Sequence, residues 1–139
     1  MSRADAFTEL TNQEEIYSDF LVNMNPHPVS GALLRFVNEK AVTRSIRNLI
    51  QTNPGERLYQ PNVGSGIRSL LFEPMSQFTA NTLRTMIEET IREYEERAQI
   101  LAVQVIPEEE RNRYSVTIVY MLINKPDPVT VNVTLQRVR

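Results

Sequence analysis

Three segments near the C-terminus alternate between apolar and polar residues, and this pattern restricts the fold more than any other feature of the chain. They are Ile100 to Ile106, Tyr114 to Ile123 and Val129 to Val138. A period of two residues is typical of a β-strand with one buried face. Because only short polar turns separate the segments, we expect them to pair as an antiparallel meander.

Each predicted strand has one apolar face, because successive side chains of a strand point to opposite sides. The residues expected to share these faces are Leu101, Val103 and Val105 in the first strand, Tyr114, Val116, Ile118, Tyr120 and Leu122 in the second, and Val129, Val131, Val133 and Leu135 in the third.

Two longer segments have the period of an α-helix. Asn38 can cap a helix that runs to about Thr52, and a second helix is expected from about Thr79 to Arg97. Ile67 to Phe72 is expected to add one or two helical turns. The predicted inward residues are Val42, Ile46, Leu49 and Ile50 in the first helix, and Leu83, Met86, Ile87, Thr90, Ile91 and Tyr94 in the second.

Helices that cover the apolar face of an antiparallel sheet give an α+β fold. We therefore predict an antiparallel three-stranded C-terminal meander packed against two main helices. Residues 16 to 37 contain Asn25-Pro26-His27-Pro28, which interrupts any helix, so this N-terminal segment is expected to be mostly irregular with room for a short strand. A length of 139 residues suits one domain, assigned to residues 16 to 139 after an extension of residues 1 to 15.

The loop between the predicted helices is rich in proline, which restricts the backbone dihedral angles, and in glycine, which allows unusual ones. Asn53 to Pro74 holds three of the four glycines and three of the eight prolines. Such a loop is expected to keep one shape. Gly64-Ser65-Gly66 lacks the third glycine and the following lysine of nucleotide-binding loops, so we interpret it as a shaped turn.

Composition excludes several classes of function. A net charge of −2 argues against broad nucleic-acid binding, and the absence of cysteine removes disulfides and thiolate sites. The single histidine, His27, is too little for a zinc site or a convincing Ser-His-Asp triad. No apolar run is long enough for membrane insertion. We expect no cofactor, no metal and no catalytic residue.

Paired carboxylates are the signature that a glycosidase would need. The candidates are Asp19, Glu56, Glu73, Glu95 and Glu96. Acidic residues are common in the chain, and adjacent Glu95 and Glu96 would point about 100° apart on a helix. These residues therefore give little support to an enzyme.

Two other features allow both a plain and a functional interpretation. Tyr94-Glu95-Glu96-Arg97 is either a solvated helix end or a place where Glu95 and Arg97 bind a partner through charge-assisted hydrogen bonds. Val129 to Gln136 contains no lysine, proline or inward charge that would protect an exposed sheet edge. That edge is either covered by another segment or extended by a partner strand.

Taken in order, several motifs resemble the small baseplate wedge proteins of contractile-tailed phages, a gene-twenty-five-like family often called lysozyme-like. The resemblance runs from about Tyr17 to the C-terminus. The motifs that carry it are Tyr17-Ser18-Asp19-Phe20, the helix from Ala41 to Ile50, Pro54-Gly55-Glu56-Arg57, Pro61-Asn62-Val63-Gly64-Ser65-Gly66, Leu71-Phe72-Glu73-Pro74 and Leu101-Ala102-Val103-Gln104-Val105.

The resemblance implies a structural role as a sheath initiator. The family's Glu-Pro-Arg signature would fall at Glu95-Glu96-Arg97, where glutamate replaces the proline, so the helix is expected to run slightly further. Glu95 and Arg97 would then contact the helical core bundle of larger wedge proteins. The strand with Val129, Val131, Val133 and Leu135 would be the edge onto which sheath strands are added.

The implied partners are other baseplate wedge proteins and the tail sheath protein, without nucleic acid, membrane insertion or a stable homo-oligomer. The implied location is the virion tail baseplate, with assembly in the host cytoplasm. Phage tails and type VI secretion particles remain equally open. The alternatives are a peptidoglycan-degrading, lysozyme-like hydrolase and a small α+β adaptor outside any tail.

Overall fold

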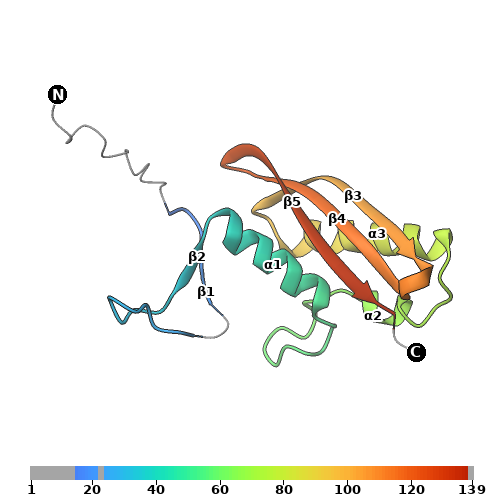
Figure 1. Ribbon diagram of the computed structural model, residues 1–139, viewed down its shortest axis with the longest axis horizontal. Coiled ribbons are helices and arrows are strands. Elements are labelled where there is room, and N and C mark those ends of the chain that lie inside the picture. Colours follow the sequence, from blue (N-terminus) through green and yellow to red (C-terminus); the bar gives the residue numbers. More distant parts are fainter. Residues whose placement is uncertain (1–14, 22–23, 138–139) are drawn as a thin grey trace. The chain divides into compact units, whose positions relative to one another are not determined.

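The computed structural model describes residues 15–21 and 24–137, and these divide into two compact units, N-terminal and C-terminal, at the boundary between Ala41 and Val42 (Figure 1). The predicted boundary after residue 15 stays a prediction, because residues 1–14 lie outside the described part. The elements are β1 (Ser18–Phe20), β2 (Arg35–Val37), α1 (Glu39–Gln51), α2 (Ile67–Leu70), α3 (Gln77–Tyr94), β3 (Ala98–Glu108), the 3-10 turn η1 (Glu109–Arg111), β4 (Arg113–Leu122) and β5 (Lys125–Gln136).

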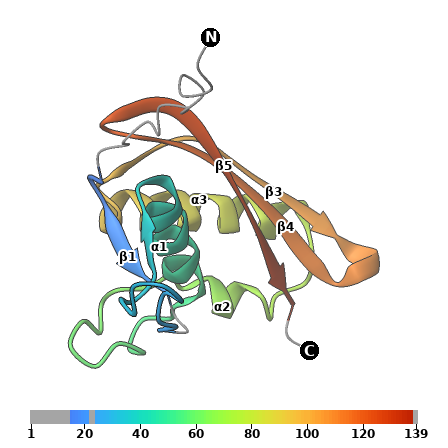
Figure 2. The same cartoon turned by 60° about the vertical axis from the view of Figure 1, so that its left-hand side comes forward.

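The C-terminal unit is built on the predicted meander. Its three-stranded sheet has the order β3-β4-β5, and both pairs are antiparallel. Every second residue of the central strand β4, from Tyr114 to Leu122, is buried as predicted. Figure 2 shows α3 and α1 on the same side of this sheet. The predicted α+β class is therefore confirmed.

The helices contribute the other half of the core. The four apolar residues predicted for the first helix are all buried in α1. In α3, Leu83, Ile87, Thr90 and Ile91 are buried, whereas Met86 and Tyr94 are only partly covered. Ser76 caps α3 by accepting a hydrogen bond from the Thr79 amide at 3.1 Å, so the helix begins two residues before the predicted start.

A bulge in β3 changes one predicted inward residue. The register with β4 shifts between Ile100 and Ala102, so Leu101 has no partner in the ladder. A bulge inserts one residue and reverses the alternation on one side of it. Leu101 is consequently 51% exposed, whereas Val103 and Val105 beyond the bulge are buried. The prediction that Leu101 faces the core is wrong for this reason.

The predicted continuation of the long helix through Arg97 is also wrong. The helix ends at Tyr94, and the Glu95 amide donates the last helical hydrogen bond to the Ile91 carbonyl. Residues 95–97 turn, and β3 begins at Ala98, which is buried. The chain turns here and places Ala98 in the sheet. The expectation that glutamate in place of proline makes the helix slightly longer than in the family stays a prediction.

The N-terminal unit contains more regular structure than predicted. β1 and β2 pair antiparallel, with Ser18 opposite Val37 and Phe20 opposite Arg35. Asn38 has a φ of 49°, and its Oδ1 accepts hydrogen bonds from the Ile16 and Tyr17 amides. Asn38 directly precedes α1, as predicted, and these two bonds also tie it to the residues just before β1.

The loop after α1 is clamped to the end of that helix. Ser65 is 1% exposed, its hydroxyl donates to the Ile50 carbonyl at 2.6 Å, and its amide donates to the Thr52 carbonyl at 2.9 Å. These bonds satisfy carbonyls that the helix end leaves without partners. Gly64 has a φ of 145°, and a Cβ there would lie 2.7 Å from the Thr52 oxygen. The predicted shaped turn is confirmed.

The two glycines with positive φ in this loop should respond differently to alanine. Gly64→Ala should lower the free energy of unfolding by about 3 kcal/mol or more, because the new methyl group collides with backbone as well as straining φ. Gly55 has a φ of 90° but open space around it, so Gly55→Ala should cost only about 1–2 kcal/mol. Urea unfolding of both variants measures the difference, and equal losses would contradict the clamp.

Candidate functional site

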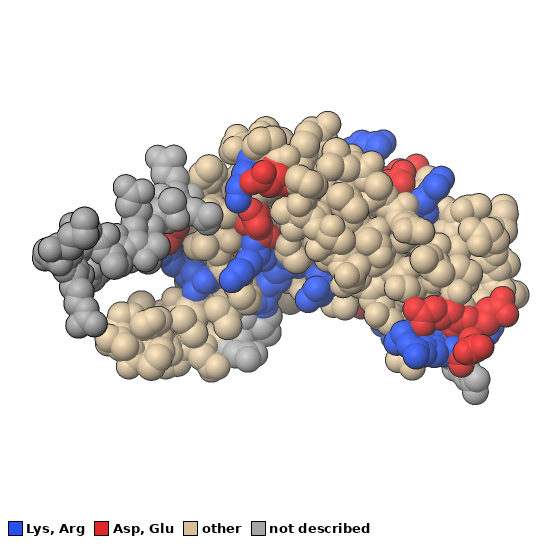
Figure 3. All heavy atoms as spheres, turned by 45° about the horizontal axis from the view of Figure 1, so that its top comes forward, with Lys and Arg blue, Asp and Glu red and all other residues tan. Residues whose placement is uncertain are grey.

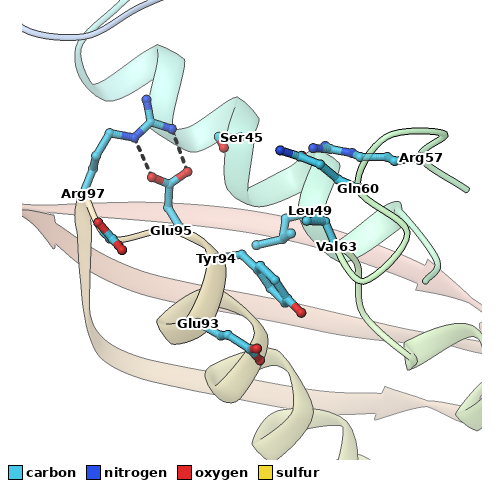
Figure 4. Close-up of a pocket in the computed structure, with 10 residues that line it drawn as sticks. Ser45, Leu49, Arg57, Gln60, Val63, Glu93, Tyr94, Glu95 and Arg97 are labelled. Atoms are coloured by element: carbon cyan, nitrogen blue, oxygen red, sulfur yellow. Dashed lines mark hydrogen bonds and ion pairs between the residues drawn. The ribbon is translucent and has the colours of Figure 1, made fainter. Parts of the chain in front are cut away.

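A pocket in the C-terminal unit lies between the end of α3, the middle of α1 and the glycine-rich loop (Figure 4). Its volume is about 490 Å³. It brings the charged helix end together with the proline and glycine loop, two features that are far apart in the sequence. The lining residues are Ser45, Leu49, Arg57, Gln60, Val63, Glu93, Tyr94, Glu95, Glu96 and Arg97.

Glu95 and Arg97, the predicted partner-binding residues, form an ion pair at this pocket. Arg97 Nε donates to Glu95 Oε1 at 2.5 Å, and Nη2 donates to Oε2 at 2.7 Å. Such a two-point pair fixes the plane of the guanidinium as well as its charge. The Glu95 side chain is 3% exposed and that of Arg97 is 35% exposed. Glu95 is therefore mainly an internal support, and Arg97 is the member that reaches the surface.

Glu95 is an ionised carboxylate in this environment. Burial raises its pKa, but hydrogen bonds from Arg97 and Ser45 and the charge of Arg97 outweigh burial, so the pKa lies below its ordinary value. The Ser45 hydroxyl comes from α1, and Figure 4 shows Ser45 beside the Glu95–Arg97 pair. Glu95 thus links the end of α3 to the helix beside it.

The loop wall of the pocket is anchored to α3 through Tyr94. Its hydroxyl donates to the Asn62 carbonyl at 2.8 Å, across 32 residues of sequence. Burial, followed by the charge of Glu93, raises the pKa of Tyr94, which keeps the phenol protonated as a donor. Ser45, Arg57 and Tyr94 were not predicted to act together. Their shared position depends on tertiary packing, and no sequence spacing signals it.

The predicted sheath-facing strand is an edge strand in the described part of the chain. β5 pairs with β4 alone. The side chains of Val131, Val133 and Leu135 are buried and that of Val129 is partly covered, so they hold β5 against the core. What β5 offers to a partner is therefore its outer row of backbone amides and carbonyls.

The beginning of β5 differs from its remainder. Lys125, Pro126, Asp127 and Pro128 occupy the first four positions of the strand. Proline removes an amide donor, and charged side chains discourage edge-to-edge pairing. Within β5, only the segment from Val129 to Gln136 is left without proline, lysine or acidic residues along the edge.

Among the carboxylates considered for a glycosidase, Glu95 and Glu96 both line the pocket. Asp19 belongs to the N-terminal unit. The Glu56 carboxylate accepts from the amide and side chain of Asn53, and these bonds, the amide first, lower its pKa. Glu95 is committed to Arg97. Glu56 and Glu95 therefore each have a local structural use.

Other site classes find little support. In residues 15–21 and 24–137 no group of three His, Cys, Asp or Glu side chains could hold a metal ion. None of the helices described there has the length and apolar character needed to cross a membrane. Figure 3 shows acidic and basic side chains next to one another on the face drawn. One such pair is Glu108 and Arg113 at the β3–β4 connection, whose side chains lie 2.7 Å apart. This face therefore does not present a purely basic surface of the kind that nucleic acids bind.

The stability of the protein should depend on the charge of Glu95. Because its folded-state pKa is lowered, its stabilising effect is fully present above the ordinary value of 4.5 and is lost as pH falls through the folded value. Glu95→Gln should cost about 1–3 kcal/mol at pH 7, and the difference from the unmodified protein should shrink as the pH falls below 4.5 and through the lowered pKa of Glu95. Urea unfolding across this pH range measures it.

Glu96→Gln is the matched control, because Glu96 is the exposed neighbour of Glu95. It should leave unfolding unchanged at pH 7. A Glu95→Gln cost that is equally large at pH 7 and pH 3 would show that packing, rather than charge, explains the effect.

Comparison with known proteins identifies the family of the chain. Residues 37–127 match the family described as "Baseplate wedge protein gp25". The chain is 31% identical over 120 residues to baseplate wedge protein gp25 of Enterobacteria phage T4, covering 86% of this chain and 90% of that protein. This match and the family match confirm the resemblance found in the sequence.

Two solved structures are similar in fold. A chain of the anti-feeding prophage baseplate has a TM-score of 0.68 and 27% identity, covering 80% of this chain and 89% of that one. A Geobacter sulfurreducens protein described as a candidate tail lysozyme has a TM-score of 0.72 and 23% identity, covering 78% and 98%, which shows the fold alone. On its sequence and its fold, the chain belongs to the baseplate wedge protein gp25 family.

Proposed function

We propose that this chain joins the helical core bundle of larger wedge proteins to the tail sheath, and that β5 templates sheath polymerisation by strand addition. Membership of the baseplate wedge family gives it a structural role in a baseplate. The observation that carries the finer proposal is the position of β5 at a sheet edge, with Val129 to Gln136 free of edge-protecting residues.

Strand addition suits a protein that must start an ordered polymer. An edge strand offers regularly spaced donors and acceptors, so a strand that pairs with it is fixed in direction and register. The buried valines of β5 hold this template against the core of the unit. Repetition of such contacts around a tail axis would make a weak single contact into a strong assembly.

The Glu95–Arg97 pair supports the proposed contact with the core bundle. A guanidinium whose plane is fixed by a buried carboxylate loses little freedom when a partner binds it. Arg97 is held in this way at the rim of an open pocket. In this proposal Glu95 orients Arg97, and Arg97 makes the contact.

The proposed partners are other wedge proteins and the tail sheath protein, and assembly takes place in the host cytoplasm before the chain becomes part of the tail baseplate. No stable homo-oligomer is required, because both proposed surfaces address other proteins.

The peptidoglycan hydrolase alternative is less well supported. A glycosidase acid needs a raised pKa so that it carries a proton near neutral pH. Glu95 has a lowered pKa and gives both oxygens to Arg97. The pocket that contains it therefore suits recognition of a protein surface better than proton transfer to a sugar.

Removal of the Arg97 contact should weaken wedge assembly. Arg97→Ala alone leaves the Glu95 carboxylate buried without its partner, so the double variant Glu95→Gln/Arg97→Ala is the cleaner test. It should fold and bind the co-expressed larger wedge proteins about tenfold more weakly or worse. Quantitative co-purification measures this, and Arg92→Ala, an exposed arginine in the last turn of α3, is the control. Binding equal to that of the control would refute the assigned contact.

Proline substitutions along β5 should separate folding from sheath recruitment. Successive amides of a strand point to opposite edges, so proline at one parity removes a bond to β4 and at the other removes an outer donor. Of Asn132→Pro and Val133→Pro, one should destabilise the protein, and the other should fold but fail to recruit sheath protein. Thermal unfolding and sheath polymerisation on assembled baseplates measure the two effects. Normal polymerisation on the folded variant would contradict strand addition at β5.

A further inference from the structure

The tip of the loop beside the pocket exposes two large apolar side chains almost completely. Leu58 is 93% exposed and Tyr59 is 96% exposed, the highest values among the large hydrophobic side chains of the described residues. Burial of such side chains is worth about 1.5–3 kcal/mol each when they leave water. Neither contributes this to the fold of the chain, so the tip has apolar surface available for a partner.

The loop that carries this tip is not a loose connection. The Gly55 amide donates to the Pro61 carbonyl at 2.7 Å and closes the base of the tip. Glu56 accepts from Asn53, and Asn62 accepts from Tyr94 of α3. A projection that is already ordered pays little conformational entropy when it binds.

Arg57 connects the tip to the pocket. It directly precedes Leu58 and lines the pocket wall with Gln60, as Figure 4 shows. Among the described residues the Arg57 side chain has neither an ion pair nor a hydrogen bond, in contrast to Arg97. The surface that begins at the Glu95–Arg97 pair therefore continues along the loop, first as the unpaired guanidinium of Arg57 and then as the apolar tip formed by Leu58 and Tyr59.

We propose that Leu58 and Tyr59 are anchor residues that insert into an apolar groove of the same helical wedge partner that Arg97 contacts, with Arg57 pairing with a carboxylate at the edge of that groove. This inference rests on the proposed function, since the tip is continuous with the Arg97 surface. Tyrosine and arginine, present here as Tyr59 and Arg57, are two of the residue types enriched in interface hot spots. Helices packed side by side can form an apolar groove between them, and a carboxylate at its edge would complement the charge of Arg57.

The test compares three variants in binding to the co-expressed larger wedge proteins. Leu58→Ser/Tyr59→Ser removes the tip, and Glu95→Gln/Arg97→Ala removes the proposed pair contact. Phe78→Ser is the matched control, because Phe78 is 81% exposed in the first turn of α3, at the opposite end of that helix from the pocket. The tip variant should keep the thermal unfolding midpoint and bind about tenfold more weakly or worse, whereas the control should bind normally.

The outcomes separate the two proposals. Weak binding of the tip variant with normal binding of the control supports the tip as an anchor. Normal binding of the tip variant with weak binding of the pair variant overturns the anchor and keeps the proposed function. Normal binding of both variants, or no binding by the unmodified protein, overturns both. Self-association of the unmodified protein in sedimentation that the tip variant abolishes would assign the tip to a second copy and overturn the wedge groove.

Discussion

The ion pair between Glu95 and Arg97 is the interaction on which the arrangement of the C-terminal unit depends. It lies where α3 ends and the chain turns into β3, and its carboxylate is buried beside α1. A buried charge is costly unless it is paired and hydrogen-bonded, so the two residues constrain each other closely. This interaction therefore lies at the junction of α3 and β3 and holds the Arg97 guanidinium, which is 35% exposed, beside the buried Glu95 carboxylate.

The glycine-rich loop is ordered by a second set of contacts of a different kind. Ser65 binds the last carbonyls of α1, and Gly64 lies so close to the Thr52 carbonyl that no larger residue fits. Tyr94 holds the middle of the loop from the other side. The loop is thus anchored to α1 through Ser65 and to α3 through Tyr94. These anchors keep its exposed tip in place although the tip has no apolar core beneath it.

The central strand β4 and the edge strand β5 have different roles in the sheet. β4 has neighbours on both edges and buries an uninterrupted row of side chains from Tyr114 to Leu122. β5 contributes the same kind of inward row but keeps one edge without a strand in the described part of the chain. A strand can serve as a template only if its other edge and its apolar face are already committed, and β5 meets both conditions.

The sequence by itself determined the α+β class, the antiparallel meander, the inward residues of β4 and β5 and the shaped turn at Gly64-Ser65-Gly66, because these depend on local periodicity and on backbone conformations that few residues allow. The family could also be recognised from ordered motifs. Only the tertiary structure decided that Leu101 leaves the core, that α3 ends before Glu95, and that Arg57 and Ser45 line the same pocket as the Glu95–Arg97 pair. A bulge, a helix end and a pocket depend on contacts between distant segments, and no local pattern encodes the free-energy balance among those contacts.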